Sequence, residues 1–274
     1  MIFSSFDFEL VHENSSNKAV LLFHGMTGTP FEMKKYASFL FKNGFDVYCY
    51  CLPGHGNHPV SIYCVSWKDW IEFSKEKFSD HRSKYDYFFL GGLCLGAVIS
   101  LNLCEIYNNI KGIICLSTTL FLDGWTIPKY NFLMPIGLYT ILRYYYTFPE
   151  REPFGIKNEN YRRIIQKLTS KNNVALDHYP MNAIYELLRL SKYTRKYLDK
   201  ITSPVLLIHS KHDDLTSIKS AELVFNRISS RKKKMVILKN SYHLIIHDNE
   251  RENVFKESVE FLNNCIHKKV EALL

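Results

Sequence analysis

Short apolar runs alternate with longer amphipathic runs along most of this 274-residue chain, and this alternation constrains the fold more than any other feature. The short runs have the length of strands, and the stretches between them carry apolar side chains at helical spacing. The predicted strands occupy residues 19–25, 45–52, 87–92, 112–117, 204–210 and 234–240. Apolar strands separated by helices predict an α/β fold, in which a mostly parallel sheet is flanked by helices.

The alternation is interrupted between about Thr119 and Lys200. This segment is rich in Tyr, Phe, Arg and Lys, and it contains no strand pattern. Its periodicity predicts two helices, at residues 160–169 and 181–198. We therefore expect residues 1–118 and 201–274 to form the core, and residues 119–200 to form a helical cap or lid over the sheet.

The sequence GLCLG, from Gly92 to Gly96, lies between a predicted strand and a predicted helix. A strand that turns sharply into a helix at Cys94 needs glycine two residues before and two residues after it, because larger side chains would collide. The turn holds its central residue in a strained position at a helix N-terminus, where the helix dipole favours a thiolate or an oxyanion. A merely buried thiol requires none of this, so the motif indicates a nucleophile.

Candidate partners for Cys94 follow other predicted strands. Asp213 and Asp214 come after the strand at 204–210, and His243 comes after the strand at 234–240. Because the carboxyl ends of parallel strands meet at one edge of the sheet, these side chains are expected to lie near Cys94. Either aspartate could orient the histidine, and Asp214 could instead cap the helix that follows.

A glycine-containing loop, HGMTG, follows the first predicted strand. Its Met26 N–H, together with the N–H of Leu95 beside the nucleophile, would form an oxyanion hole. We expect His24 to support this loop from within the structure. His55 and His58, in the sequence GHGNH, are expected to shape a turn.

In this order along the chain, HGMTG, LPGHGNHP (residues 52–59), GLCLGA, HDD and SYHL resemble the α/β-hydrolase superfamily over nearly the whole sequence. The pattern is most similar to small capped carboxylesterases and monoacylglycerol-lipase-like hydrolases. The cysteine at the elbow resembles that of dienelactone hydrolases and polyhydroxyalkanoate synthases. The resemblance implies an α/β-hydrolase fold with a catalytic triad of Cys94, Asp213 and His243, because HDD places Asp213 where the family has its acid.

The resemblance implies a hydrolase that cleaves carboxylic esters or thioesters through a covalent acyl-enzyme. A thioester intermediate is readily attacked by amines and thiols, so an acyltransferase or condensing enzyme is an alternative. A ligand-binding homologue without activity is a second alternative, and the intact Asp213 and His243 argue against it. A cysteine introduced in place of a native serine would give the same sequence. The substrate is expected to be a small acyl ester or thioester, free or bound to a carrier.

The formal net charge is +8, but the basic residues are spread along the chain, and no nucleic-acid-binding module occurs in it. We therefore expect no nucleic-acid partner, whereas contact with an anionic lipid surface fits the charge. No secretory signal pattern is found at the N-terminus, and the apolar run at residues 130–142 is too short to span a bilayer. Seven cysteines without a Cys-x-x-Cys pair predict reduced thiols and a cytoplasmic location.

The remaining motifs predict no cofactor and no metal. No glycine-rich nucleotide-binding pattern is present. His243 and His247 have the spacing of two zinc ligands on a helix, but neither an intervening Glu nor a third ligand is apparent. The cysteines other than Cys94 are expected to be buried thiols. Four aromatic residues of the cap could either line an acyl pocket or pack the cap onto the sheet: Trp125, Tyr144, Tyr145 and Tyr146.

Overall fold

The computed structural model describes residues 6–13, 16–56, 61–107, 110–128, 134–172, 175–176 and 178–267. Within these ranges, seven strands form one sheet in the order β1-β3-β2-β4-β5-β8-β9. They are β1 (Phe8–Leu10), β2 (Lys18–Phe23), β3 (Asp46–Cys49), β4 (Tyr87–Leu93), β5 (Ile113–Leu116), β8 (Val205–Ser210) and β9 (Lys233–Leu238). All neighbouring pairs are parallel except β1 and β3.

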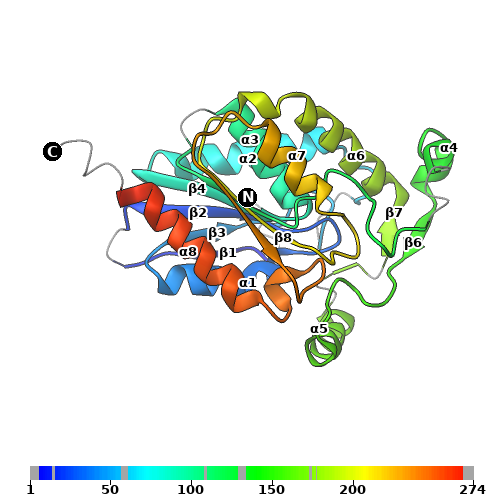
Figure 1. The fold of residues 1–274 in the computed structure, drawn as a ribbon. Coiled ribbons are helices and arrows are strands. Elements are labelled where there is room, and N and C mark those ends of the chain that lie inside the picture. The colour runs from blue at the N-terminus through cyan, green and yellow to red at the C-terminus, as the bar shows by residue number, and fades with distance from the viewer. Residues whose placement is uncertain are drawn as a thin grey trace.

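Helices cover both faces of the sheet (Figure 1). α1 (Pro30–Lys42) and α8 (Arg251–His267) pack on one face, where their apolar side chains join one buried cluster. α2 (Trp67–Arg82), α3 (Leu95–Ile106) and α7 (Lys219–Arg227) contribute to a second cluster on the other face. Burial on both faces explains why the strands read as apolar runs, and the predicted α/β-hydrolase fold is confirmed.

The order of the strands places the predicted functional loops together. β4 lies between β2 and β5, and its register pairs Phe23 of β2 with Gly92 of β4. The carboxyl ends of β2, β4, β5, β8 and β9 all lie at the same edge of the sheet because these strands are parallel. Residues far apart in the sequence therefore meet at this edge.

The chain between β5 and β8 contains α4 (Met134–Leu138), α5 (Glu159–Asn172) and α6 (Met181–Lys196), with short 3₁₀ turns at Ile141–Tyr144 and Leu198–Lys200. α5 and α6 match the two predicted helices. A short antiparallel ribbon of β6 (Thr147–Pro149) and β7 (His178–Pro180) also occurs here, so the expectation of no strands in this segment is wrong. The two strands have three residues each, which is too short for a period-of-two pattern to show.

Two further features complete the fold. The three-residue strand β1 was also not expected, and it adds an antiparallel edge to the sheet. Another 3₁₀ turn, Ile245–His247, separates β9 from α8. Among the helices in the described ranges, none is both long and apolar enough to cross a bilayer.

Candidate active site

Cys94 lies at a sharp turn between β4 and α3, and its backbone has φ 56° and ψ −112°. A positive φ is unfavourable for a residue with a side chain, and such strain is found mainly where the surrounding structure enforces it. Here the Cys94 N–H donates to the Leu116 carbonyl at 3.0 Å, which ties the turn to the neighbouring strand. The turn therefore has the geometry of a nucleophile elbow.

The two glycines of the motif are required by close backbone contacts. A Cβ on Gly92 would lie 2.2 Å from the carbonyl carbon of Gly96. A Cβ on Gly96 would lie 2.1 Å from the carbonyl oxygen of Phe23. Both clashes involve backbone atoms that cannot move independently of the sheet, so only glycine fits at either position, as the sequence predicted.

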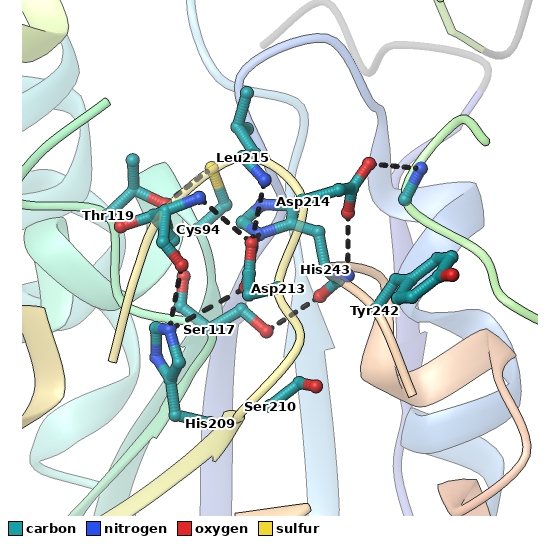
Figure 2. Close-up of polar contacts among 12 residues, drawn as sticks. Cys94, Ser117, Thr119, His209, Ser210, Asp213, Asp214, Leu215, Tyr242 and His243 are labelled. Carbon is teal, nitrogen blue, oxygen red and sulfur yellow. Dashed lines mark hydrogen bonds and ion pairs between the residues drawn. The ribbon is translucent and has the colours of Figure 1, made fainter. Parts of the chain in front are cut away.

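His243 and Asp213 form a hydrogen-bonded pair beside Cys94 (Figure 2). The Nδ1 atom of His243 lies 3.0 Å and 2.9 Å from the two carboxylate oxygens of Asp213. Both side chains are buried, and Asp213 follows β8 while His243 follows β9. The structure thus brings together Cys94, Asp213 and His243 from three separate loops.

The electrostatics of this cluster favour a charged imidazole. Burial alone would lower the pKa of His243, but the negative charges of Asp213 and Cys94 raise this pKa well above its ordinary value. Burial alone would raise the pKa of Asp213, and the His243 imidazole holds this pKa below its ordinary value instead. The arrangement is therefore suited to a thiolate–imidazolium pair that is supported by a carboxylate.

Asp213 is itself held by several groups. One of its carboxylate oxygens accepts hydrogen bonds from the N–H groups of Leu215 and Thr216, both at 2.9 Å. The Nε2 atom of His209 lies 3.6 Å from the other oxygen, and burial lowers the pKa of this histidine. These contacts fix the carboxylate in the direction of His243.

Asp214 has a different role from the helix cap considered above. Its carboxylate accepts the His243 N–H at 3.1 Å and the Gly155 N–H at 3.1 Å. The Leu244 N–H donates to the Gly155 carbonyl at 2.7 Å in the same place. Asp214 therefore joins the backbone of the histidine loop to the segment between β6 and α5, and it does not cap α7.

The loop after β2 contains the predicted oxyanion donor Met26. The Nδ1–H of His24 donates to the Gly25 carbonyl at 2.8 Å, since Nε2 accepts the Leu52 N–H at 3.0 Å, so His24 supports this loop as expected. His55 Nε2 lies 2.7 Å from the Met26 carbonyl oxygen. The loop therefore rests on two buried histidines, whereas His58 lies outside the described residues.

The amides next to the two predicted donors are already engaged. The Gly25 N–H donates to the carboxylate of Glu32, and the Cys94 N–H donates to Leu116. Leu95 is the first residue of α3, so its N–H has no partner one turn earlier in the helix. The N–H groups of Met26 and Leu95 remain the predicted oxyanion donors.

Sequence reasoning missed Glu32, which lies on α1 and lines the same cavity as Cys94. Burial raises its pKa to about 7, and the negative charge of Glu150 contributes in the same direction. Gly28 makes room for this side chain, because a Cβ there would lie 2.3 Å from a carboxylate oxygen of Glu32. The only sequence signal was an acidic residue in the first turn of the helix that follows the HGMTG loop.

Sequence reasoning also missed the two side chains that follow β5. The Thr119 Oγ1 atom lies 3.2 Å from the Cys94 sulfur, and the Ser117 hydroxyl donates to the His243 carbonyl at 2.6 Å (Figure 2). Both residues are buried. The available signal was that Ser117 ends a predicted strand and Thr119 follows it, at the same sheet edge as the other functional loops.

A cavity of about 1170 Å³ opens above Cys94. Side chains from the sheet edge and from the segment between β5 and β8 line it, and most are apolar. Examples are Leu122, Ile127, Met134, Leu142, Phe148 and Ile184. His243, Glu32 and Glu150 supply polar groups to its wall. The cavity exceeds the usual 300–1000 Å³ range of small-molecule sites, so it can hold an extended apolar group.

The remaining expectations have mixed outcomes. Four aromatic residues were expected either to line the pocket or to pack the cap onto the sheet. Only Tyr146 lines the cavity, and all four side chains are exposed: Trp125, Tyr144, Tyr145 and Tyr146. Cys64 is exposed and Cys265 is only partly buried, so the expectation of a buried thiol is wrong for Cys64 and is met only in part by Cys265. Within the described ranges, no group of three or more His, Cys, Asp or Glu side chains has the arrangement of a metal site.

The fold and the clustered loops define an α/β hydrolase of the esterase-like kind. Over residues 14–250 the chain matches the hydrolase family described as serine aminopeptidase, S33, and it belongs to that family. The family is named for a serine, and this chain carries cysteine at the elbow.

Two curated relatives align over most of their length. The thermostable monoacylglycerol lipase of Bacillus sp. (strain H-257) is 28% identical, with 88% of this chain and 89% of the relative covered. The carboxylesterase of Bacillus subtilis (strain 168) is 28% identical, with 90% and 92% covered. The structure of the Paleococcus ferrophilus monoacylglycerol lipase superposes with a TM-score of 0.79 at 19% identity, covering 94% of this chain and 98% of that one.

Proposed function

We propose that the protein hydrolyses carboxylic esters or thioesters through a covalent acyl-enzyme on Cys94. The observation that carries this proposal is the placement of a strained elbow cysteine beside the His243–Asp213 pair. An inert thiol would need neither the backbone strain nor the carboxylate that supports the imidazole. The relatives, a monoacylglycerol lipase and a carboxylesterase, support the same reaction class.

In the proposed first step, His243 Nε2 takes the proton of the Cys94 thiol. Nε2 is the free ring nitrogen for this step, because Nδ1 is hydrogen-bonded to Asp213. The sulfur attacks the acyl carbon, and the tetrahedral oxyanion is stabilised by the N–H groups of Met26 and Leu95. Collapse of this intermediate breaks the bond to the leaving group, which takes the proton from His243. One oxyanion donor typically contributes about 3 kcal/mol to lowering the barrier.

In the second step, His243 removes a proton from water, and the resulting hydroxide attacks the thioester carbonyl. Cys94 leaves as a thiolate, which takes back the proton held by His243, and the carboxylic acid is released. Asp213 keeps the imidazole in the correct tautomer and stabilises its charged form in both steps. An amine or thiol that replaces water would turn the same chemistry into acyl transfer.

We further propose that the acyl group is of medium or long chain length. The apolar walls and the volume of the cavity above Cys94 support this substrate class. Exposed apolar residues on the α4 region fit contact with aggregated lipid: Ile136, Tyr139, Ile141, Leu142 and Tyr145. The monoacylglycerol lipase relative makes acylglycerols the first substrates to test.

The proposal is tested by steady-state hydrolysis of monoacylglycerols, aryl esters and acyl thioesters by the wild type, Cys94→Ala and Cys94→Ser. We expect turnover by the wild type and a loss of at least about 10³-fold in Cys94→Ala. If the wild type turns over only when an amine, alcohol or thiol is added, the enzyme is an acyltransferase. Equal rates for the wild type and Cys94→Ala would reject the proposed nucleophile.

A further inference from the structure

The hydroxyl of Thr119 faces two acceptors. Its Oγ1 atom lies 3.2 Å from the Cys94 sulfur and 3.1 Å from the Ser117 carbonyl oxygen, and the residue is 1% exposed. A threonine hydroxyl has a single proton, so it can donate fully to only one of the two at a time. The charge on the sulfur decides which acceptor is preferred.

The segment that carries Thr119 is held firmly in place. The Ser117 N–H donates to the Ile208 carbonyl at 2.9 Å, and its hydroxyl donates to the His243 carbonyl. Ser117 also has a φ of 45°, in the left-handed region. The Leu120 N–H donates to the Ser220 hydroxyl at 3.2 Å. The Thr119 hydroxyl is therefore positioned before the reaction begins.

We propose that Thr119 is a catalytic residue that stabilises the thiolate of Cys94, an inference that rests on the proposed function. Hydrogen bonds to a charged acceptor are stronger than those to a neutral one, so a thiolate draws the Thr119 proton away from Ser117. A neutral thiol or a thioester sulfur is a weak acceptor, so in those states the proton returns to the Ser117 carbonyl. The bond to sulfur is then strong only when the sulfur carries charge.

This selectivity matters at two points of the cycle. Before acylation, it increases the fraction of Cys94 present as the nucleophilic thiolate. During deacylation, it stabilises the sulfur as it leaves the tetrahedral intermediate, and a stabilised thiolate is a better leaving group. No proton is transferred from Thr119 in either step. The residue changes only the acceptor of its hydrogen bond.

The first test measures alkylation of Cys94 by iodoacetamide between pH 5 and pH 10, followed by mass spectrometry of the peptide that contains Cys94. Thr119→Val keeps the shape of the side chain and removes the donor, whereas Thr119→Ser keeps the donor. Thr118→Val is the matched control, because Thr118 is also buried in the same segment. Alkylation requires no turnover, so this test does not depend on finding a substrate.

We expect Thr119→Val to move the midpoint of the alkylation profile upward by about one pH unit, so that the thiolate fraction is about tenfold smaller at pH values below both midpoints. Thr119→Ser should restore the wild-type midpoint, and Thr118→Val should leave it unchanged. Should Thr119→Val fail to fold, Thr119→Ala removes the same donor with less bulk. A midpoint that is the same in the wild type and in the folded donor-free variant would overturn the proposal.

The second test uses pre-steady-state kinetics with an aryl ester. We expect Thr119→Val to slow decay of the acyl-enzyme by about tenfold, so that the acyl adduct accumulates, and Thr119→Ser to decay as the wild type does. If no ester is turned over by the wild type but the alkylation midpoints differ as expected, the proposed hydrolysis fails and the role of Thr119 at the thiolate stands. Decay rates that are equal in Thr119→Val and the wild type would contradict the leaving-group role.

Discussion

The two walls of the cavity are built in different ways. The wall formed by the sheet edge depends on backbone contacts, such as the close approach of Gly96 to Phe23, and on a network of buried hydrogen bonds around Asp213. The wall formed between β5 and β8 depends on apolar side chains of short elements, and neighbouring residues such as Tyr139 and Tyr145 are 74% and 78% exposed. The Cys94 sulfur is therefore held in a fixed position, whereas the apolar surface of the opposite wall can vary.

We therefore expect substitutions in one wall to affect mainly the reaction, and substitutions in the other wall to affect mainly the choice of substrate. A change in the sheet-edge wall alters the fold or the chemical step, because each group there holds another. We expect a change in the opposite wall to alter which substrates bind. The division of the chain into a core of residues 1–118 and 201–274 and a cap of residues 119–200 remains a prediction, and Thr119, at its boundary, contacts the core residue Cys94.

The two walls are expected to differ most in how far substitution of a glycine lowers the stability of the protein. Gly96→Ala would place a Cβ 2.1 Å from a backbone oxygen, so we expect it to prevent folding or to lower the free energy of unfolding by more than about 4 kcal/mol. In Gly137→Ala the new Cβ meets only the flexible end of Met181, at 3.2 Å, so the change should be within about 1 kcal/mol. Denaturant unfolding of both variants measures this. Equal stability would contradict the contrast.

The next largest effect is expected from the two neighbouring aspartates. Asp213→Asn removes the charge that supports the imidazole, so kcat/KM should fall by about 10³–10⁴-fold. Asp214→Asn keeps one of the two oxygens that accept the backbone N–H groups of His243 and Gly155. The His243 backbone is then held less firmly, and we expect kcat/KM to fall by only about tenfold. Ester hydrolysis by both variants tests the assignment. A greater loss of activity in Asp214→Asn than in Asp213→Asn would show that Asp214, and not Asp213, supports the imidazole of His243.

A smaller effect on stability is expected from two carboxyl groups, Glu32 and Glu150, that lie in different walls. The folded protein raises the pKa of Glu32 from 4.5 to about 7, so the folded state holds this proton more tightly than the unfolded state does. The protonated Glu32 carboxyl therefore contributes to the free energy of unfolding fully below pH 4.5, and this contribution is lost as the pH rises through 7. Glu32→Gln should therefore raise the melting temperature at pH 8 by roughly 2–6 °C and change it little at pH 4.

The control for this prediction uses the facing carboxylate. The negative charge of Glu150 contributes to the raised pKa of Glu32. Glu150→Gln should therefore shift the pH at which the stability difference between the wild type and Glu32→Gln develops to a lower value. Melting curves of both variants and the double variant between pH 4 and pH 9 measure this. A stability gain in Glu32→Gln that is the same at every pH would show that ionisation is not its cause.

The smallest effect is expected at the exposed apolar surface near α4. Ile141→Glu places a negative charge on a side chain that is 69% exposed, so stability and hydrolysis of a dissolved short-chain ester should be unchanged. Activity on monoacylglycerol in anionic vesicles should fall several-fold if this surface contacts lipid. Arg163→Gln, at an exposed position on α5, is the matched control because it changes the net charge by the same −1. Equal losses in both variants would indicate a general charge effect.

Most of the core could be predicted because its requirements are local. The Gly92–Cys94–Gly96 spacing encodes a turn that few other sequences permit, and the apolar runs encode strands buried on both faces. Asp213 and His243 each follow a strand, and parallel strands end at a common edge. The sequence therefore predicted which loops meet without any knowledge of the contacts between them.

The contacts that were missed depend on tertiary packing. Thr119 reaches Cys94 from a residue 25 positions away, and Glu32 bends back to a loop seven residues earlier. Strands β1, β6 and β7 have three residues each, and pairing with distant partners rather than sequence periodicity defines them. Asp214 was considered as a helix cap because it precedes a predicted helix. Its actual role was missed because its hydrogen bond to Gly155 joins segments 59 residues apart.

The measurement that tests the central claim most directly is intact-protein mass spectrometry after rapid mixing with acyl thioesters and activated aryl esters, run beside Cys94→Ala. The account predicts a mass increase equal to the acyl group, which is absent in Cys94→Ala and which subsequent digestion locates on the peptide that contains Cys94. The adduct should then decay in water or on addition of an acceptor. An adduct of the same yield in Cys94→Ala, or product release by that variant at the wild-type rate, would contradict the account.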